Sequence, residues 1–85
     1  MTKPSYKLGY VIASNYRKKI ILALKDKSMT PAEISKKVSI YPSHISTALK
    51  ELANKNLVVC LTPKLRKGRL YGLTKEGHKL SMNLS

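Results

Sequence analysis

The chain has 85 residues, of which 17 are Lys or Arg and 4 are Asp or Glu, so its formal net charge is +13. This length predicts a single domain, residues 1–85, with no room for a separate catalytic domain, and the longest apolar runs, IILAL and LVVCL, fall far short of the ~20 residues of a membrane span. Such a charge needs a polyanion or many counterions, which favours nucleic acid first and an anionic membrane surface second, although a generally Lys-rich proteome would also produce the excess.

The first predicted elements, in chain order, are two helices. Residues 1–14 are weakly apolar and predict a short helix, whose Tyr6 and Tyr10 would either pack in a dimer interface or cap the core. Residues 15–25 have helical periodicity, and Ser14 is a candidate N-cap. The apolar face of this second helix consists of Tyr16, Ile20, Ala23 and Leu24, with Ile21 at its edge.

A third helix start is the sequence TPAE. Thr30 can cap a helix, Pro31 suits the first helical position because its missing N–H is not needed there, and Glu33 can bond back to the cap. We predict a short helix that ends near Ser39.

A fourth helix is predicted over residues 42–54, from Pro42 in SIYPSHISTALKEL. It should stop around Lys55–Asn56, since Asn tolerates the left-handed conformation of a helix C-cap. Its apolar stripe consists of Ile45, Ala48, Leu49 and Leu52. A soluble helix usually carries Glu and Lys on its exposed face, whereas the opposite face here is mostly short and polar. It consists of Ser43, Ser46, Thr47, Lys50 and Asn54.

A hairpin and a last helix complete the predicted order. Residues 57–61 and 69–73 have strand character, and the loop TPKLRKG lies between them. Thr74 is the candidate cap of a helix with Leu80 and Leu84 on one face. The hairpin is strongly basic, through Lys64, Arg66, Lys67 and Arg69.

Two short capped helices about three residues apart predict a helix-turn-helix, and a basic hairpin after it predicts a winged helix. Short hydroxyl side chains on the second helix allow close approach to DNA and can bond phosphates or base edges. The motifs SHISTALKELANKNLV and RLYGLTKEG, within residues 14–80, resemble the winged helix-turn-helix domains of MarR-like and ArsR-like prokaryotic regulators, most of all the small stand-alone versions common in archaea.

The resemblance implies an α+β, mostly helical fold with a three-helix core, a β-hairpin wing and a C-terminal helix. It implies a cytoplasmic homodimer that binds double-stranded DNA, with residues 1–13 as an N-terminal dimerisation extension. The recognition helix, residues 42–54, would enter the major groove, and the wing, residues 62–69, would lie on the backbone or in the minor groove. The implied contact residues are Thr30, Ser43, His44, Ser46, Thr47, Lys50, Lys64, Arg66, Lys67 and Arg69.

Two weaker readings of the same interface stay open. The protein would be an architectural DNA binder if the hydroxyl face reads bases poorly, or a protein-interaction module if the helix packs on a partner. The family often has Gly where this chain has Ser39, which predicts a strained or differently bent turn.

No catalytic constellation, cofactor motif or metal-spaced cluster is present, so we expect no enzyme activity, no cofactor and no metal. The sequence identifies no small-molecule effector. Cys60, the sole cysteine, excludes an intrachain disulfide, fits a reducing cytoplasm and is expected to be a buried core thiol. His44 would either touch a phosphate or have a half-buried structural role.

Overall fold

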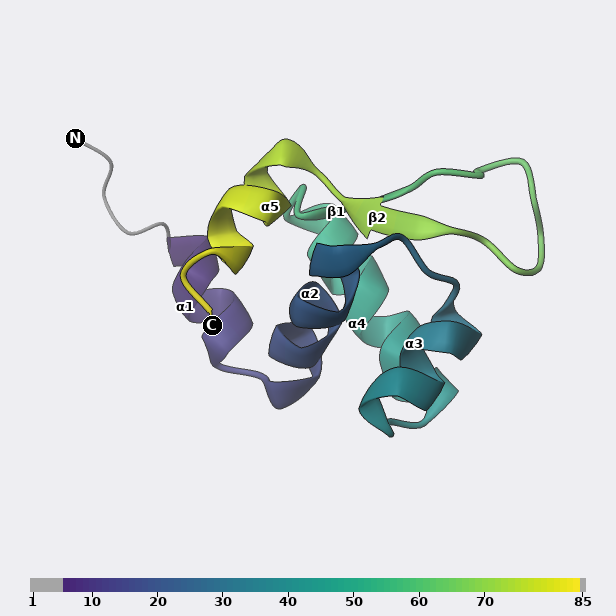
Figure 1. The fold of residues 1–85 in the computed structure, drawn as a ribbon, viewed down its shortest axis with the longest axis horizontal. Helices are drawn as coiled ribbons and strands as arrows, with labels where there is room; N and C mark the ends of the chain where they lie inside the picture. The colour runs from purple at the N-terminus through teal and green to yellow at the C-terminus, as the bar shows by residue number, and fades with distance from the viewer. Residues whose placement is uncertain (1–5, 85) are drawn as a thin grey trace.

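The computed structural model describes residues 6–84, which form five helices and one antiparallel hairpin (Figure 1). The elements in chain order are α1 (Tyr6–Ile12), α2 (Asn15–Asp26), α3 (Pro31–Val38), α4 (Pro42–Asn54), β1 (Val58–Cys60), β2 (Tyr71–Leu73) and α5 (Lys75–Ser81). This order confirms the predicted fold class. Helices α2, α3 and α4 form the three-helix core of a winged helix-turn-helix, the hairpin is its wing, and α5 is the C-terminal helix.

Three of the predicted helix caps are present and explain where the helices begin. The Ser14 hydroxyl accepts from the N–H of Arg17 at 3.3 Å. Thr30 and Glu33 form a complete capping box, with N–H to oxygen distances of 3.2 and 2.9 Å. The hydrogen bond from the backbone N–H of Thr30 also lowers the pKa of the Glu33 carboxyl. The Thr74 hydroxyl accepts from the N–H of Gly77 at 2.9 Å and so starts α5.

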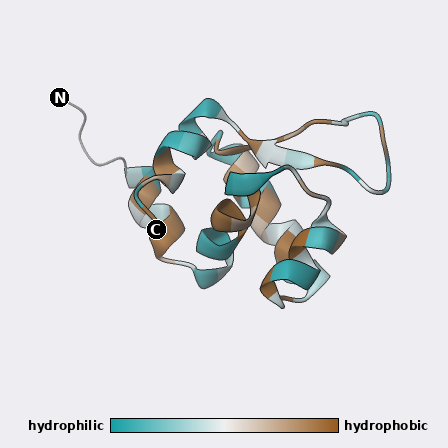
Figure 2. Cartoon of the chain, in the orientation of Figure 1, coloured by the Kyte–Doolittle hydropathy of each residue, from teal (hydrophilic) through white to brown (hydrophobic). Residues whose placement is uncertain are grey.

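The core gathers around α2, which packs against α1, α3, α4, α5 and β2. Figure 2 shows apolar residues on the sides of the helices that face the centre of the molecule and hydrophilic residues on the outer turns. The largest fully buried side chains include Ile20, Ile21, Leu24, Ile34, Ile45, Leu49, Leu52 and Leu57. The helical periodicity had predicted this face of α2, except at Tyr16, which is 40% exposed because its ring lies against His44 and not in the core.

The hairpin is shorter than predicted, and side chains explain why. Val58 pairs with Leu73 and Cys60 with Tyr71, so the regular ladder spans three residues on each strand. One further backbone bond runs from the N–H of Leu61 to the carbonyl of Leu70 at 2.7 Å. Beyond it, the side chains of Thr62 and Arg69 form hydrogen bonds with backbone groups of the loop. The thiol side chain of Cys60 is half-buried, which corrects the expectation of a buried core thiol.

The wing is also anchored from a third segment that the sequence did not reveal. Met29, in the connection between α2 and α3, exchanges two backbone hydrogen bonds with Tyr71 of β2, at 2.9 and 2.8 Å. Met29 is buried, so this bridge joins the base of the wing to the core.

Helix α1 is held on the body of the domain by cationic side chains. The Arg17 guanidinium lies 3.7 Å from the centre of the Tyr10 ring and donates to the Tyr10 carbonyl at 2.7 Å. Just after the end of α4, the Lys55 ammonium lies 5.1 Å from the centre of the same ring, so two cations contact this ring. Arg17 also pairs with Glu51 of α4 at 3.2 Å, so one side chain links α1, α2 and α4.

The turn between α3 and α4 contains a residue in a conformation that favours glycine. Ser39 has φ 58° and ψ 47°, and its N–H donates to the carbonyl of Ser35 at the end of α3. The Ser35 hydroxyl donates in turn to the carbonyl of Ile40. The strain predicted from the family pattern at Ser39 is therefore real, and hydrogen bonds on both sides hold the turn in place.

Replacing Ser39 with glycine should raise the free energy of unfolding by about 0.5–1 kcal/mol, because glycine adopts the left-handed region without the Cβ penalty. The side chain is exposed, so little packing is lost. Urea unfolding followed by circular dichroism measures the change. The matched control is Ser46→Gly in the middle of α4, which should lower stability by a similar amount. A Ser39→Gly protein no more stable than the wild type would contradict the assignment of strain.

Candidate nucleic-acid interface

The outer face of α4 is a row of exposed, short, polar side chains. Its predicted members Ser43, Ser46, Thr47, Lys50 and Asn54 are all exposed, because Ile45, Leu49 and Leu52 turn the other side of the helix into the core. The Thr47 hydroxyl donates to the carbonyl of Ser43 at 3.1 Å, one turn earlier, and its oxygen remains able to accept. This face can approach a flat or grooved partner closely and offers hydroxyl groups and one ammonium group.

The loop between the strands, residues 61–70, projects away from the helical body (Figure 1) and is exposed along most of its length. Its fold is set locally. The Thr62 hydroxyl accepts from the N–H of Leu70 at 2.9 Å, and Gly68 takes a φ of 64°. The side chains of Lys64, Arg66 and Lys67 are exposed on it. The wing therefore presents three exposed cations on a loop that hydrogen bonds close at its base.

Arg69 has a second role that the sequence did not suggest. Its guanidinium donates to the carbonyl of Leu65 at 2.6 Å and lies 3.5 Å from the carbonyl of Pro63. These bonds link the two sides of the loop, so Arg69 supports the loop that carries the other cations in addition to carrying charge itself. The sequence showed only a cluster of basic residues. The two accepting carbonyls lie four and six residues away, and the fold of the loop alone brings them to Arg69.

Thr30, another predicted contact, stands at the start of α3. Its hydroxyl accepts from the N–H of Glu33 and lies 3.3 Å from the Glu33 carboxylate. The capping box therefore engages this hydroxyl on both sides, and its contact with DNA stays a prediction.

All four acidic side chains have partners that belong neither to the outer face of α4 nor to the loop 61–70. Glu51 pairs with Arg17 at 3.2 Å, and Glu76 pairs with Lys7 at 2.8 Å, a hydrogen bond that lowers the pKa of the Glu76 carboxyl. Asp26 lies 3.9 Å from the ammonium of Lys37, and Glu33 caps α3. The outer face of α4 and the loop 61–70 thus carry cations without any carboxylate among them, which makes this surface attractive to a polyanion.

His44 lies at the margin of this surface, in the first turn of α4, and is exposed. Its imidazole ring lies 4.9 Å from the ring of Tyr16 and 6.5 Å from that of Tyr41, measured between ring centres. Of the two roles the sequence left open, the structure excludes a half-buried position and leaves the ring accessible.

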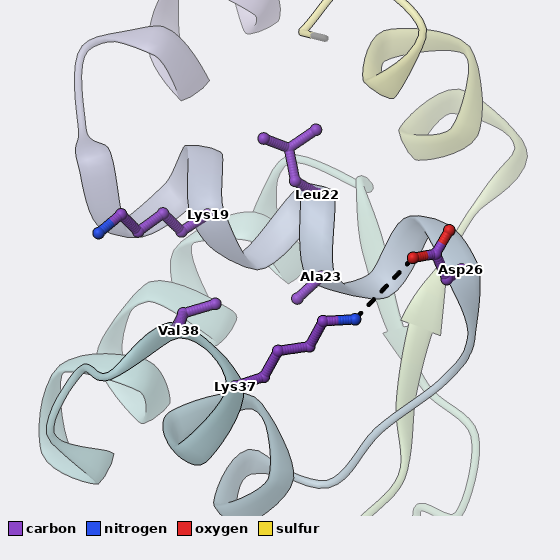
Figure 3. Close-up of a pocket in the computed structure, with 6 residues that line it drawn as sticks. All are labelled: Lys19, Leu22, Ala23, Asp26, Lys37 and Val38. Atoms are coloured by element: carbon purple, nitrogen blue, oxygen red, sulfur yellow. Dashed lines mark ion pairs between the residues drawn. The ribbon is translucent and has the colours of Figure 1, made fainter.

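A shallow hollow of about 380 Å³ lies between α2 and α3 (Figure 3). It is lined by Lys19, Leu22, Ala23, Asp26, Lys37 and Val38, and the Lys37–Asp26 pair crosses it. Because the hollow is open to solvent over most of its surface, it does not enclose a ligand. Within residues 6–84 no three His, Cys, Asp or Glu side chains gather at metal-binding distance, and no helix is long and apolar enough to cross a membrane.

Comparisons with known proteins agree with this geometry. Residues 14–59 match the family model described as bacterial regulatory protein, arsR family. No curated protein matches the chain in sequence.

Three solved structures illustrate the structural likeness. MarR of Escherichia coli in its reduced form is 25% identical, with a TM-score of 0.77 over 92% of this chain and 59% of MarR. Reduced HlyU of Vibrio cholerae is 24% identical, with a TM-score of 0.76 over 91% of this chain and 80% of HlyU. A mutant of ZitR from Lactococcus lactis is 22% identical, with a TM-score of 0.73 over 82% of this chain. The chain spans about half of ZitR, 49% of its length.

Proposed function

The chain belongs to the arsR family of bacterial regulatory proteins, and we propose that it acts in the cytoplasm as a transcriptional regulator that binds double-stranded DNA. The observation that carries this proposal is the surface formed by the outer face of α4 and the loop 61–70. It is exposed, basic and free of carboxylates, and its side chains on α4 are short.

In the proposed complex, α4 lies in the major groove. Ser43, Ser46 and Thr47 are short enough for the helix backbone to approach base edges, and their hydroxyls can donate to phosphate or accept from a base. Lys50, at the centre of the exposed face, reaches either a phosphate or a guanine. The wing cations Lys64, Arg66 and Lys67 would follow the backbone into the adjacent minor groove, where negative potential favours Arg.

We propose further that two copies bind together, with their recognition helices in successive major grooves about 34 Å apart. Exposed apolar side chains at one end of the molecule support this dimer. Tyr6 and Ile12 lie on α1, and Met82 lies just after α5, which the Lys7–Glu76 pair holds beside α1. Of the predicted dimerisation extension, residues 1–13, residues 1–5 lie outside the described part of the chain.

The wing contribution can be measured through salt. Replacing Arg66 and Lys67 with alanine should reduce the slope of log K against log salt by about 1.8, because each lost phosphate contact removes about 0.9. Fluorescence-anisotropy titrations of a labelled duplex across a salt series give the slope. The matched control is Lys75→Ala with Lys79→Ala on α5, which removes the same charge from another part of the molecule. An equal loss of slope in both double variants would mean that the wing makes no specific contact.

The same titration tests the function as a whole when two duplexes are compared, the upstream region of the protein's own gene and a random sequence. Tighter binding upstream that persists as salt rises supports a regulator. Equal and salt-steep binding to both supports an architectural DNA binder, an alternative favoured by the high charge and the hydroxyl face. If neither duplex binds at low salt, the surface is a protein-interaction site instead.

A further inference from the structure

Three aromatic side chains outside the hydrophobic core are neighbours at the start of the proposed recognition helix. Tyr16 comes from the first turn of α2, Tyr41 precedes α4, and the ring of each neighbours that of His44. All three are exposed, Tyr41 at 76% and Tyr16 at 40%. Exposed apolar groups that gather into one patch, unlike singly exposed ones, often mark a surface that contacts a partner.

The polar atoms of this cluster are unused within the described part of the chain. In residues 6–84 no hydrogen bond joins the Tyr16 or Tyr41 hydroxyl, or either imidazole nitrogen of His44, to another protein group. The His44 ring centre lies 4.9 Å from that of Tyr16 and 6.5 Å from that of Tyr41, so the three rings are neighbours before any partner binds. Two tyrosine rings and an imidazole with free polar atoms are thus exposed as neighbours, and Ser43 precedes His44 in the chain.

Within the described part of the chain, no ion pair involves the His44 side chain. The titratable groups that face its ring are Tyr16 from α2 and Tyr41 from the turn before α4. Arg17, which follows Tyr16 in α2, and Glu51, two turns after His44 in α4, pair with each other at 3.2 Å. The Glu51 carboxylate is therefore engaged by Arg17, and the exposed imidazole is open to a phosphate.

We propose that Tyr16, Tyr41 and His44 form a subsite for one phosphate of the DNA backbone, and that His44 takes up a proton when this phosphate binds. The proposal rests on the proposed function, because it assumes that α4 contacts duplex DNA. Histidine is the side chain that changes charge between pH 5 and 8, and an adjacent phosphate stabilises the charged ring. DNA affinity should therefore rise as the pH falls through this range.

The test is anisotropy titration of a labelled duplex at pH 8 and at pH 6, each over a salt series at matched ionic strength. For the wild type we expect about three- to tenfold tighter binding at pH 6, since a full proton taken up sets the limit at tenfold per pH unit. The slope of log K against log salt should also steepen by about 0.9, equivalent to one added ionic contact. In His44→Gln both differences should disappear, because glutamine keeps a donor but cannot gain a charge.

The chain provides a matched control in its other histidine. His78 is exposed on α5, so His78→Gln should retain both pH effects. For the hydroxyls, Tyr16→Phe with Tyr41→Phe should weaken binding about two- to fivefold per lost hydrogen bond. A pH effect that survives in His44→Gln, or is absent from the wild type, would overturn the subsite. Failure of the wild type to bind DNA at either pH would instead reject the proposed function and the subsite with it.

Discussion

Lys50→Glu is expected to weaken DNA binding about 30- to 100-fold at low salt. Lys50 is exposed at the centre of the polar face of α4, and reversal of its charge removes one ionic contact and places a carboxylate against the phosphates. Because no acidic side chain otherwise occupies this face, the reversal would introduce its first repulsive group. Anisotropy titration at fixed salt gives the ratio of dissociation constants.

The matched control for this charge reversal is Lys79→Glu. Lys79 is exposed on α5, and its replacement changes the net charge by the same amount. If affinity depended on net charge alone, both variants would lose binding equally, and α4 would have no special place in the interface. Thermal unfolding of both proteins, followed by circular dichroism, shows whether either loss reflects unfolding. We expect both to unfold close to the wild-type temperature, since exposed charges contribute little to stability.

Gly77→Ala is expected to lower the free energy of unfolding by about 2–4 kcal/mol, although alanine is the better helix former. Gly77 is buried in α5, and a Cβ there would collide with the backbone carbonyl oxygen of Leu57. That oxygen accepts from the N–H of Thr74 at 3.1 Å, and the Thr74 hydroxyl donates to the carbonyl of Asn56 at 2.7 Å. The backbone cannot yield without loss of these bonds, so α5 would have to move off the turn after α4.

For a domain of this size the loss corresponds to a fall in Tm of about 10–25 °C. The matched control is Gly9→Ala, since Gly9 lies in α1 with no atom within 4 Å of an added Cβ. There the same substitution should raise stability by about 0.5–1 kcal/mol, because alanine loses less backbone entropy in a helix. Thermal and urea unfolding of the two variants give opposite signs if the contact at Leu57 controls the outcome. Two changes of the same sign would show that helix propensity, and not the close approach, dominates.

Most of the helical architecture could be predicted from the sequence because its causes are local. Thr30 and Glu33 are three residues apart, and so are Thr74 and Gly77. Both partners of each cap can therefore be recognised from the sequence. The apolar stripe of α4 follows from helical periodicity, and Asn56, predicted to accept the left-handed conformation, has a φ of 60°. The predicted limits of α4, residues 42–54, match the structure.

The sequence predicted which residues form the candidate interface but not the contacts that position them. Periodicity placed the hydroxyl side chains and Lys50 outside the core, and composition revealed a basic loop. The brace formed by Arg69 within the loop, and the contact of Tyr16 with His44, depend on how the chain turns between these residues. Periodicity assigned Tyr16 to the core because it lies on the apolar face of α2. The same pattern does not show that the first turn of this helix extends beyond the core, where Tyr16 is 40% exposed.

The sequence by itself therefore determined the order of the elements, the buried stripe of each core helix and the excess of positive charge, because these depend on residues within one or two helical turns and on composition. Tertiary structure alone decided which partners the charged and aromatic side chains found. Arg17 meets Glu51 across 34 positions, and Met29 pairs with Tyr71 across a longer stretch of chain. Such contacts form only after hydrophobic burial has fixed the helices relative to one another, and no local pattern encodes them.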